Sequence, residues 1–109
     1  MPSMLERVQG SLDMMILKTL MNGTMHGWGI AHHIRLRSRE ALEVRQGALY
    51  PALHRLEDGG LIRGEWGTSD NNRRARFYTI TAAGRKHLAT ETADWKSFVQ
   101  VVSVVMELA

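Results

Sequence analysis

The stretch from Gly47 to Ile62 constrains the fold most, because it predicts a short helix with one apolar face and a defined end. Pro51 has no backbone N–H, so we expect the helix to start near Ala48, with Pro51 in its first turn. Gly59-Gly60 should end it, since glycine readily takes the left-handed conformation of a C-terminal cap. The apolar residues recur at i, i+3, i+4 and i+7, the spacing of one helix face: Leu49, Ala52, Leu53 and Leu56.

The opposite face of this predicted helix is polar and carries little aliphatic bulk. At about 100° per residue it presents Gly47, Tyr50, Pro51 and His54, with Arg55 on its flank. One face is therefore expected to be buried in the domain. The other is suited to lie against a second surface.

The charge of the chain is concentrated in its middle. Residues 26–86 hold eleven Lys and Arg against six Asp and Glu, a net of +5, whereas the remaining residues hold three against five, a net of −2. A basic middle favours a polyanionic partner. On charge alone, a merely solvated basic surface is a serious alternative.

Length and composition predict one cytoplasmic domain. A chain of 109 residues is large enough for one core. It contains no cysteine, which excludes disulfides and thiolate sites and fits a reducing compartment. We identify no signal peptide and no uncharged run of the roughly 20 residues that span a bilayer.

Two helices are predicted before the central one. Ser11 can cap a helix over residues 12–21, which Asn22-Gly23 would end. Its apolar stripe is broad, and we interpret it as packed against the core and, as a hypothesis, against a second subunit. Residues 25–35 are expected to begin the second helix, with Ile30 and Ile34 pointing inward.

Three histidines near the second helix raise the question of a metal site. His32 and His33 are adjacent and point about 100° apart on a helix. No carboxylate follows His26 or His32 at i+4. The structural interpretation is favoured, and we predict neither a metal nor a cofactor.

A β-hairpin is predicted after the central helix. Residues 61–66 and 74–80 have strand character, and residues 67–73 between them are rich in turn formers. Residues 38–44, ahead of the central helix, could form one very short strand. Three helices followed by a hairpin form a winged helix-turn-helix. The hairpin places three arginines near its tip: Arg73, Arg74 and Arg76.

The last helix is expected to begin after a Thr81 cap and to run to about Leu108. Leu88, Trp95 and Val102 are spaced by seven, and residues 99–106 are almost uncharged. Such an apolar surface exceeds what a small domain can cover and usually marks an interface. We interpret it as a homodimer interface, with a partly frayed tail as the alternative.

These motifs together resemble the PadR family of transcriptional regulators, over nearly the whole chain. The most specific are Leu49-Tyr50-Pro51-Ala52-Leu53 and Gly60-Leu61-Ile62, while Ile80-Thr81-Ala82-Ala83-Gly84 is shared more loosely among winged helices. His26-Gly27-Trp28-Gly29-Ile30 also matches, although Tyr or Leu is common in the family where Trp28 stands.

The resemblance implies a mainly α fold with a small β-hairpin, as a winged helix over residues 1–80 and a dimerisation helix over residues 81–109 in one compact domain. It further implies a dimeric protein that binds double-stranded DNA, in most cases a repressor, released by a small aromatic or drug-like ligand. The length matches the short form of the family, in which the single C-terminal helix packs against the first helix of the partner.

The resemblance places Tyr50 at the DNA. A phenol on the first turn of a groove-inserted helix can donate to phosphate; the alternative for Tyr50 is a ring packed at the helix flank. Helix N-termini favour phosphate, and the far end of the same face can reach bases. For the three arginines of the predicted hairpin, the alternative to DNA contact is a solvated strand end. For His54, DNA contact and no contact are equally supported. The predicted DNA-binding residues are Arg45, Gln46, Tyr50, His54, Arg55, Arg73, Arg74 and Arg76.

The last helix carries two further predictions. Trp95, with Phe98 beside it, is a candidate to stack on a planar ligand, as the resemblance implies, although the residues alone support only a core or interface tryptophan. The predicted dimer interface comprises Leu12, Ile16, Leu20, Leu88, Trp95, Val99, Val102 and Met106.

No enzyme is predicted. The chain has no thiol, no metal-ligand spacing, no phosphate-binding glycine loop and no arrangement of serine, base and acid. The alternative function is a winged-helix module that binds a protein without sequence-specific DNA binding.

Overall fold

The computed structural model describes the backbone of residues 4–107 and the side chains of residues 10–107. Within this range the chain is mainly helical, with one small antiparallel sheet. In chain order the elements are α1 (Met4–Leu20), β1 (Met25–His26), α2 (Gly27–Arg37), α3 (Gln46–Asp58), β2 (Ile62–Thr68), β3 (Arg74–Ile80) and α4 (Ala82–Glu107).

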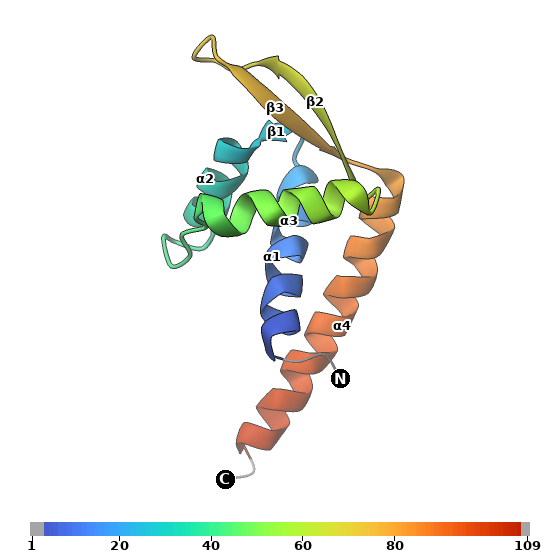
Figure 1. Ribbon diagram of the computed structural model, residues 1–109. Coiled ribbons are helices and arrows are strands. Elements are labelled where there is room, and N and C mark those ends of the chain that lie inside the picture. The colour runs from blue at the N-terminus through green and yellow to red at the C-terminus, as the bar shows by residue number, and fades with distance from the viewer. Residues whose placement is uncertain (1–3, 108–109) are drawn as a thin grey trace.

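The arrangement is that of a winged helix. The strand order is β1-β3-β2, and the hairpin of β2 and β3 pairs from Ile62 opposite Ile80 to Thr68 opposite Arg74. We call residues 62–80 the wing. α3 crosses in front of α1, the wing rises at one end, and α4 runs beside α1 and then extends beyond it (Figure 1).

The core lies where α1, α2 and α3 meet the base of the sheet. The predicted stripe of α3 is confirmed, because each of its four residues is at most 3% exposed. α1 supplies Ile16 and Leu17, and the sheet supplies Ile62. The buried hydrophobic residues are Ile16, Leu17, Leu20, Ile30, Ile34, Leu49, Ala52, Leu53, Leu56, Ile62, Tyr78, Ile80 and Leu88.

The start of the first helix was predicted wrongly. α1 begins at Met4, so Ser11 lies inside the helix and is not its N-cap. A serine is favoured at caps because its hydroxyl bonds nearby backbone groups, yet inside an already growing helix each further residue gains a backbone hydrogen bond. The predicted end is confirmed, since α1 stops at Leu20 and Gly23 has a φ of +134°.

The third strand of the sheet is not where the sequence indicated. Residues 38–44 contain no strand, whereas Met25 and His26 form β1 and pair with Tyr78 and Phe77 of β3. His26 also caps α2, because its Nδ1 accepts from the Gly29 N–H at 3.0 Å. This cap moves the helix start to Gly27.

α3 begins two residues earlier than predicted, at Gln46, so that Pro51 lies in its second turn. The backbone bond that Pro51 cannot make would go to the carbonyl of Gly47, an exposed residue. The predicted end is confirmed. Gly60 has a φ of +73°, its N–H donates to the Glu57 carbonyl, and the Leu61 N–H donates to the Leu56 carbonyl at 2.9 Å.

The start of α4 is locked against the start of the wing. Thr81 caps the helix as predicted, since the Gly84 N–H donates to Thr81 Oγ1 at 3.0 Å. The same hydroxyl donates to the Gly60 carbonyl at 2.7 Å, and the Thr81 N–H donates to the Leu61 carbonyl at 3.1 Å. A Cβ on Gly84 would clash with that Leu61 oxygen, so only glycine fits without a backbone shift.

An ion pair joins the wing to α3. Arg76 of β3 donates to the carboxylate of Glu57 on α3. Its guanidinium lies over Gly64 of β2, where a Cβ would come within 2.6 Å of Arg76 Nε. The hydrogen bond from Arg76 lowers the pKa of Glu57 below its ordinary value. This ion pair therefore helps to fix the orientation of the wing relative to α3.

We expect Gly84→Ala to destabilise the protein by about 1–3 kcal/mol, the usual cost of overpacking, because Leu61 would have to shift its backbone. Gly10→Ala is the matched control. Gly10 lies in α1, and no atom of the described residues lies within 4 Å of the place that a Cβ would occupy, so alanine should leave stability unchanged or raise it by about 0.5–1 kcal/mol. Urea unfolding measures both. Equal stabilities for Gly84→Ala and the wild type would contradict this packing.

The ion pair of Glu57 predicts a pH-dependent difference in stability. Because the folded pKa is lowered, the stabilisation is present above the ordinary glutamate pKa of about 4.3 and is lost as the pH falls through the folded pKa. Glu57→Gln should therefore be less stable than the wild type at pH 7, and the difference should shrink at a pH below the folded pKa of Glu57.

Urea unfolding at both pH values measures this difference. Glu65→Gln is the control, because Glu65 is 74% exposed and should behave like the wild type at either pH. A difference between Glu57→Gln and the wild type that stays constant with pH would show that the charge of Glu57 does not stabilise the fold.

Candidate nucleic-acid interface

Tyr50 lies on the exposed face of α3 and is held by α2. Its side chain is 48% exposed. The ring packs on Gly27, where a Cβ would lie 3.3 Å from both Tyr50 Cε1 and Tyr50 Oη. Gly27 thus lets the backbone of α2 approach the ring closely. The ring is fixed on one side while Tyr50 remains partly open to solvent.

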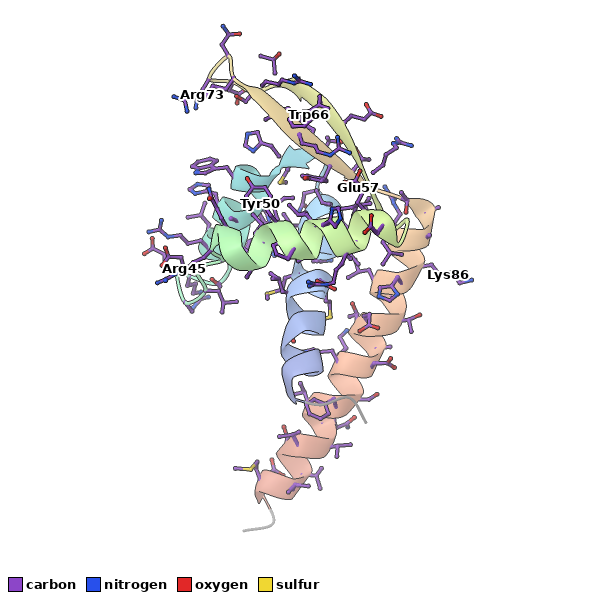
Figure 2. The ribbon with its side chains drawn as sticks, in the orientation of Figure 1. Arg45, Tyr50, Glu57, Trp66, Arg73 and Lys86 are labelled. Atoms are coloured by element: carbon purple, nitrogen blue, oxygen red, sulfur yellow. The ribbon has the colours of Figure 1, made fainter. Side chains whose placement is uncertain are left out.

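A cleft of about 660 Å³ lies between the wing and the part of α2 and α3 that contains Gly27 and Tyr50. We call it the α3–wing cleft. Tyr50 of α3 and Trp28 of α2 line one side, and Trp66, Arg73 and Arg74 line the other. Figure 2 shows Tyr50 on the side of α3 that faces the wing, with Trp66 and Arg73 on the wing itself. Arg76 lines the cleft as well, so aromatic rings, a phenol and three guanidinium groups share one concave surface.

The three wing arginines have different surroundings. Arg74 lies over the Trp66 ring, 4.5 Å from its centroid, because Trp66, Arg74 and Arg76 share one face of the hairpin. Stacking on a ring leaves a guanidinium charged. Arg76 is paired with Glu57, whereas Arg73 is exposed and makes no ion pair within the described residues.

Two predicted side chains on α3 have acidic partners. Arg55 donates to Asp13 of α1 at 3.0 Å, so its guanidinium is held toward α1 and away from the wing. Burial raises the pKa of Asp13 even though Arg55 opposes this shift. His54 Nε2 lies 3.4 Å from Asp58 Oδ2 on the outer face of α3.

The N-terminus of α3 is open. Arg45 is the N-cap residue, without a side-chain capping bond, and both Arg45 and Gln46 are exposed. Figure 2 places Arg45 at the end of α3 that is farthest from Glu57. The structure thus brings Tyr50, Arg73 and Arg74 together and places Arg45 and Gln46 at one end of α3.

Sequence reasoning missed two exposed tryptophans at this cleft. Trp28 is 69% exposed and stacks on His32, with ring centroids 4.7 Å apart and planes 11° apart. Trp66 is 59% exposed. Trp28 lies off the buried Ile30–Ile34 stripe of α2, and Trp66 lies on the same strand face as Arg76. Helical and strand periodicity could therefore have identified both tryptophans as exposed.

The predicted dimer residues other than Trp95 fall into two groups. Ile16, Leu20 and Leu88 are 0%, 2% and 7% exposed within a single chain, so their own core covers them and no partner is required. Their place in a dimer interface stays a prediction, as does that of Leu12, which is partly buried against the core. The second group lies on α4 and is accessible: Val99, Val102 and Met106 are 43%, 40% and 71% exposed.

Trp95 and Phe98, the candidate ligand residues, are half-buried on α4, with ring centroids 6.2 Å apart. Their rings lie at 41° to each other. The wider surface of α4 beyond them is apolar. Even so, within residues 4–107 no helix is long and apolar enough to cross a membrane.

The chain is similar to known transcriptional regulators. It is 34% identical over 88 residues to transcriptional regulator Rv3488 of Mycobacterium tuberculosis, a match that covers 81% of this chain and 78% of the relative. It is 24% identical over 100 residues to an uncharacterised protein of Lysinibacillus sphaericus, over 92% of each chain.

Solved structures have the same fold. A transcriptional regulator from Clostridium thermocellum superposes with a TM-score of 0.82 at 28% identity, over 90% of this chain and 95% of the other. A PadR family regulator from Eggerthella lenta gives 0.79 at 25% identity, over 96% and 89%. The model of the transcriptional regulator PadR-like family matches residues 16–90. The chain therefore belongs to the PadR-like family of transcriptional regulators.

Proposed function

We propose that the protein acts as a dimeric transcriptional repressor whose α3 enters the major groove of double-stranded DNA. The observation that carries this proposal is the α3–wing cleft, in which Tyr50 and the guanidinium groups of Arg73 and Arg74 lie on one surface. A helix with a free polar face beside a cationic hairpin fits a groove and its flanking phosphates.

The cleft suits the sugar–phosphate backbone. Tyr50 can donate its hydroxyl to a phosphate oxygen without burying a charge. Arg73 at the tip and Arg74 on Trp66 supply positive charge, while Trp28 and Trp66 offer flat surfaces to sugars. Arg45 and Gln46 would contact the DNA at the start of α3, where the helix dipole also attracts phosphate.

The predicted contacts of His54, Arg55 and Arg76 are weaker proposals. Arg76 and Arg55 are paired with Glu57 and Asp13, so contact with phosphate would require exchange of one anion for another. We therefore assign Arg76 to the positioning of the wing. Arg55 and His54 remain candidates, since both are exposed on α3.

The proposed dimer would use α4. Val99, Val102 and Met106 recur at i, i+3 and i+7 and form an apolar face that the described chain leaves exposed. Two copies that pair through this face would remove it from water. They would also present two copies of α3 to a palindromic site about one helical turn apart.

We further propose that a small planar ligand regulates the dimer through Trp95 and Phe98, whose neighbouring rings lie at the start of the exposed half of α4. Since the protein would act on DNA, we expect it in the cytoplasm and without catalytic activity of its own. The competing function, a winged-helix module that binds another protein, would not require Arg73 and Arg74 to meet phosphate.

The DNA proposal predicts unequal roles for the wing arginines. Replacement of Arg73 and Arg74 together by alanine should weaken binding to specific and nonspecific DNA. The slope of log K against log salt should fall by about 0.9 for each phosphate that the variant no longer neutralises. Arg63→Ala is the matched control, because Arg63 lies on the opposite face of the hairpin from Trp66.

A salt-titrated shift assay with DNA from upstream of the protein's own gene measures these effects. Absence of salt-dependent binding by the wild type would contradict the proposal and would favour the protein-binding module. A larger loss of affinity in Arg63→Ala than in the double variant of Arg73 and Arg74 would also contradict it, since the wing would then face DNA with its other side.

The dimer proposal predicts that Val102→Glu separates the subunits, because the face of Val102 would have to bury an unpaired charge. Val104→Glu is the control: Val104 is 53% exposed but lies on the other side of α4. Sedimentation at micromolar concentration should show a dimer for the wild type and Val104→Glu, and a monomer for Val102→Glu.

DNA affinity of Val102→Glu should fall far more than its unfolding free energy, since one protomer offers half of the phosphate contacts. The core of each subunit should persist, because Ile16 and Leu20 are covered within one chain. A wild type that sediments as a monomer would refute the dimer and the two-half-site model together.

A further inference from the structure

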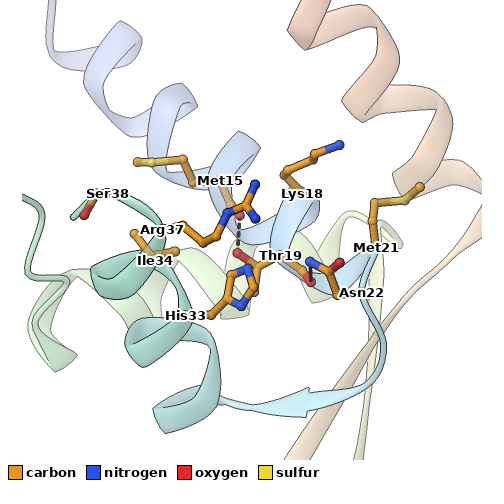
Figure 3. Close-up of a pocket in the computed structure, with 9 residues that line it drawn as sticks. All are labelled: Met15, Lys18, Thr19, Met21, Asn22, His33, Ile34, Arg37 and Ser38. Carbon is orange, nitrogen blue, oxygen red and sulfur yellow. Dashed lines mark hydrogen bonds between the residues drawn. The ribbon is translucent and has the colours of Figure 1, made fainter. Parts of the chain in front are cut away.

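A second cleft, remote from the wing, lies between the C-terminal halves of α1 and α2, and we call it the α1–α2 cleft. Its volume is about 440 Å³, within the range of small-molecule sites. It is separate from Trp95 and Phe98, since no residue of α4 lines it. Figure 3 shows His33 and Arg37 reaching from α2 toward Thr19 of α1.

The cleft combines an apolar wall with basic groups. Met15 of α1, Met21 just after the end of α1 and Ile34 of α2 supply apolar surface. Lys18 reaches it from α1, and His33 and Arg37 reach it from α2. His33 and Arg37 are four residues apart and so lie on one face of α2, toward Lys18 on the other helix.

No carboxylate balances these basic groups. Among the described residues, neither Asp nor Glu lines the cleft, and no ion pair involves Lys18, His33 or Arg37. Lys18 and Arg37 lie in the last turns of their helices, where the helix dipole favours a positive charge. The dipoles explain why these charges are tolerated, but they leave the charged heads free to bind an anion.

The neutral polar groups of the cleft already have partners. Thr19 Oγ1 donates to the Met15 carbonyl at 2.8 Å, and Asn22 Nδ2 donates to the Thr19 carbonyl at 3.3 Å. Ser38 Oγ donates to the Arg35 carbonyl and accepts from the Leu42 N–H, both at 3.0 Å. The hydrogen-bonding capacity left for a ligand is therefore mainly that of cationic donors, which select an acceptor with negative charge.

We propose that the α1–α2 cleft binds an amphipathic monocarboxylate. Its carboxylate would accept from Arg37, with Lys18 adding positive charge and the imidazole of His33 offering an N–H. Its apolar body would lie against Met15, Met21 and Ile34. Methionine side chains are unbranched and adapt to different shapes, so an alkyl chain is accommodated as readily as a ring. The site does not depend on DNA binding, and its test requires no DNA.

Octanoate is the probe, and 1-octanol is the neutral control of the same chain length. The full-length protein is titrated while the methyl NMR signals of Met15, Met21 and Met106 are followed. We expect saturable shifts of the Met15 and Met21 signals with octanoate and at least tenfold weaker binding of octanol, since octanol offers no charge to the basic groups.

Arg37→Gln should weaken octanoate binding by about tenfold, and Lys18→Gln should weaken it by a smaller factor. Arg35→Gln is the matched control: Arg35 lies in the same last turn of α2, but it pairs with Glu40 and does not line the cleft. It should leave octanoate affinity unchanged. The unshifted signals of the other methionines report that each variant is folded.

Three results would overturn the site. The first is binding of octanol as strong as that of octanoate, which would reduce the cleft to an apolar surface. The second is an unchanged affinity in Arg37→Gln. The third is a shift of the Met106 signal without shifts of Met15 and Met21, which would place octanoate on the exposed end of α4.

Discussion

The contact of Gly84 with the Leu61 carbonyl is the constraint on which the arrangement of the domain depends. At this point α3 has just ended, β2 begins, β3 has ended and α4 starts, so four elements meet within a few residues. The Thr81 hydroxyl ties the cap of α4 to Gly60 at the end of α3. Because each of these bonds joins two elements, the direction of α3, the base of the wing and the direction of α4 are set together.

Ion pairing then decides which basic groups the domain can offer to a partner. Glu57 and Asp13 hold Arg76 and Arg55 within the structure. Arg74 instead has an aromatic ring as its neighbour, and a ring does not cancel a charge. The total charge of the chain is therefore a poor guide to its binding surface. What matters is which guanidinium groups lack a carboxylate nearby, because only these meet an anion without first losing a partner.

α2 borders both clefts of the domain. At its N-terminus Gly27 supports the Tyr50 ring in the α3–wing cleft, and at its C-terminal half Arg37 faces α1. The helix is anchored between these ends by Ile30 and Ile34, which are buried in the core. The two ends of α2 therefore line the two clefts, while its middle packs in the core. α4 shows a similar division, with Leu88 buried near its start and an apolar surface left open toward its end.

The sequence by itself determined the local features: the apolar stripe of α3, its glycine end, the bounds of β3 and the Thr81 cap. These depend on residue periodicity and on groups a few positions apart, which the order of residues specifies directly. Only the tertiary structure decided the ion pairs of Arg55 and Arg76, which join residues 42 and 19 positions apart, and the pairing of β1 with β3. It also decided that Ile16 and Leu20 are covered by their own chain, because periodicity identifies which face of a helix is buried but cannot specify which surface covers it.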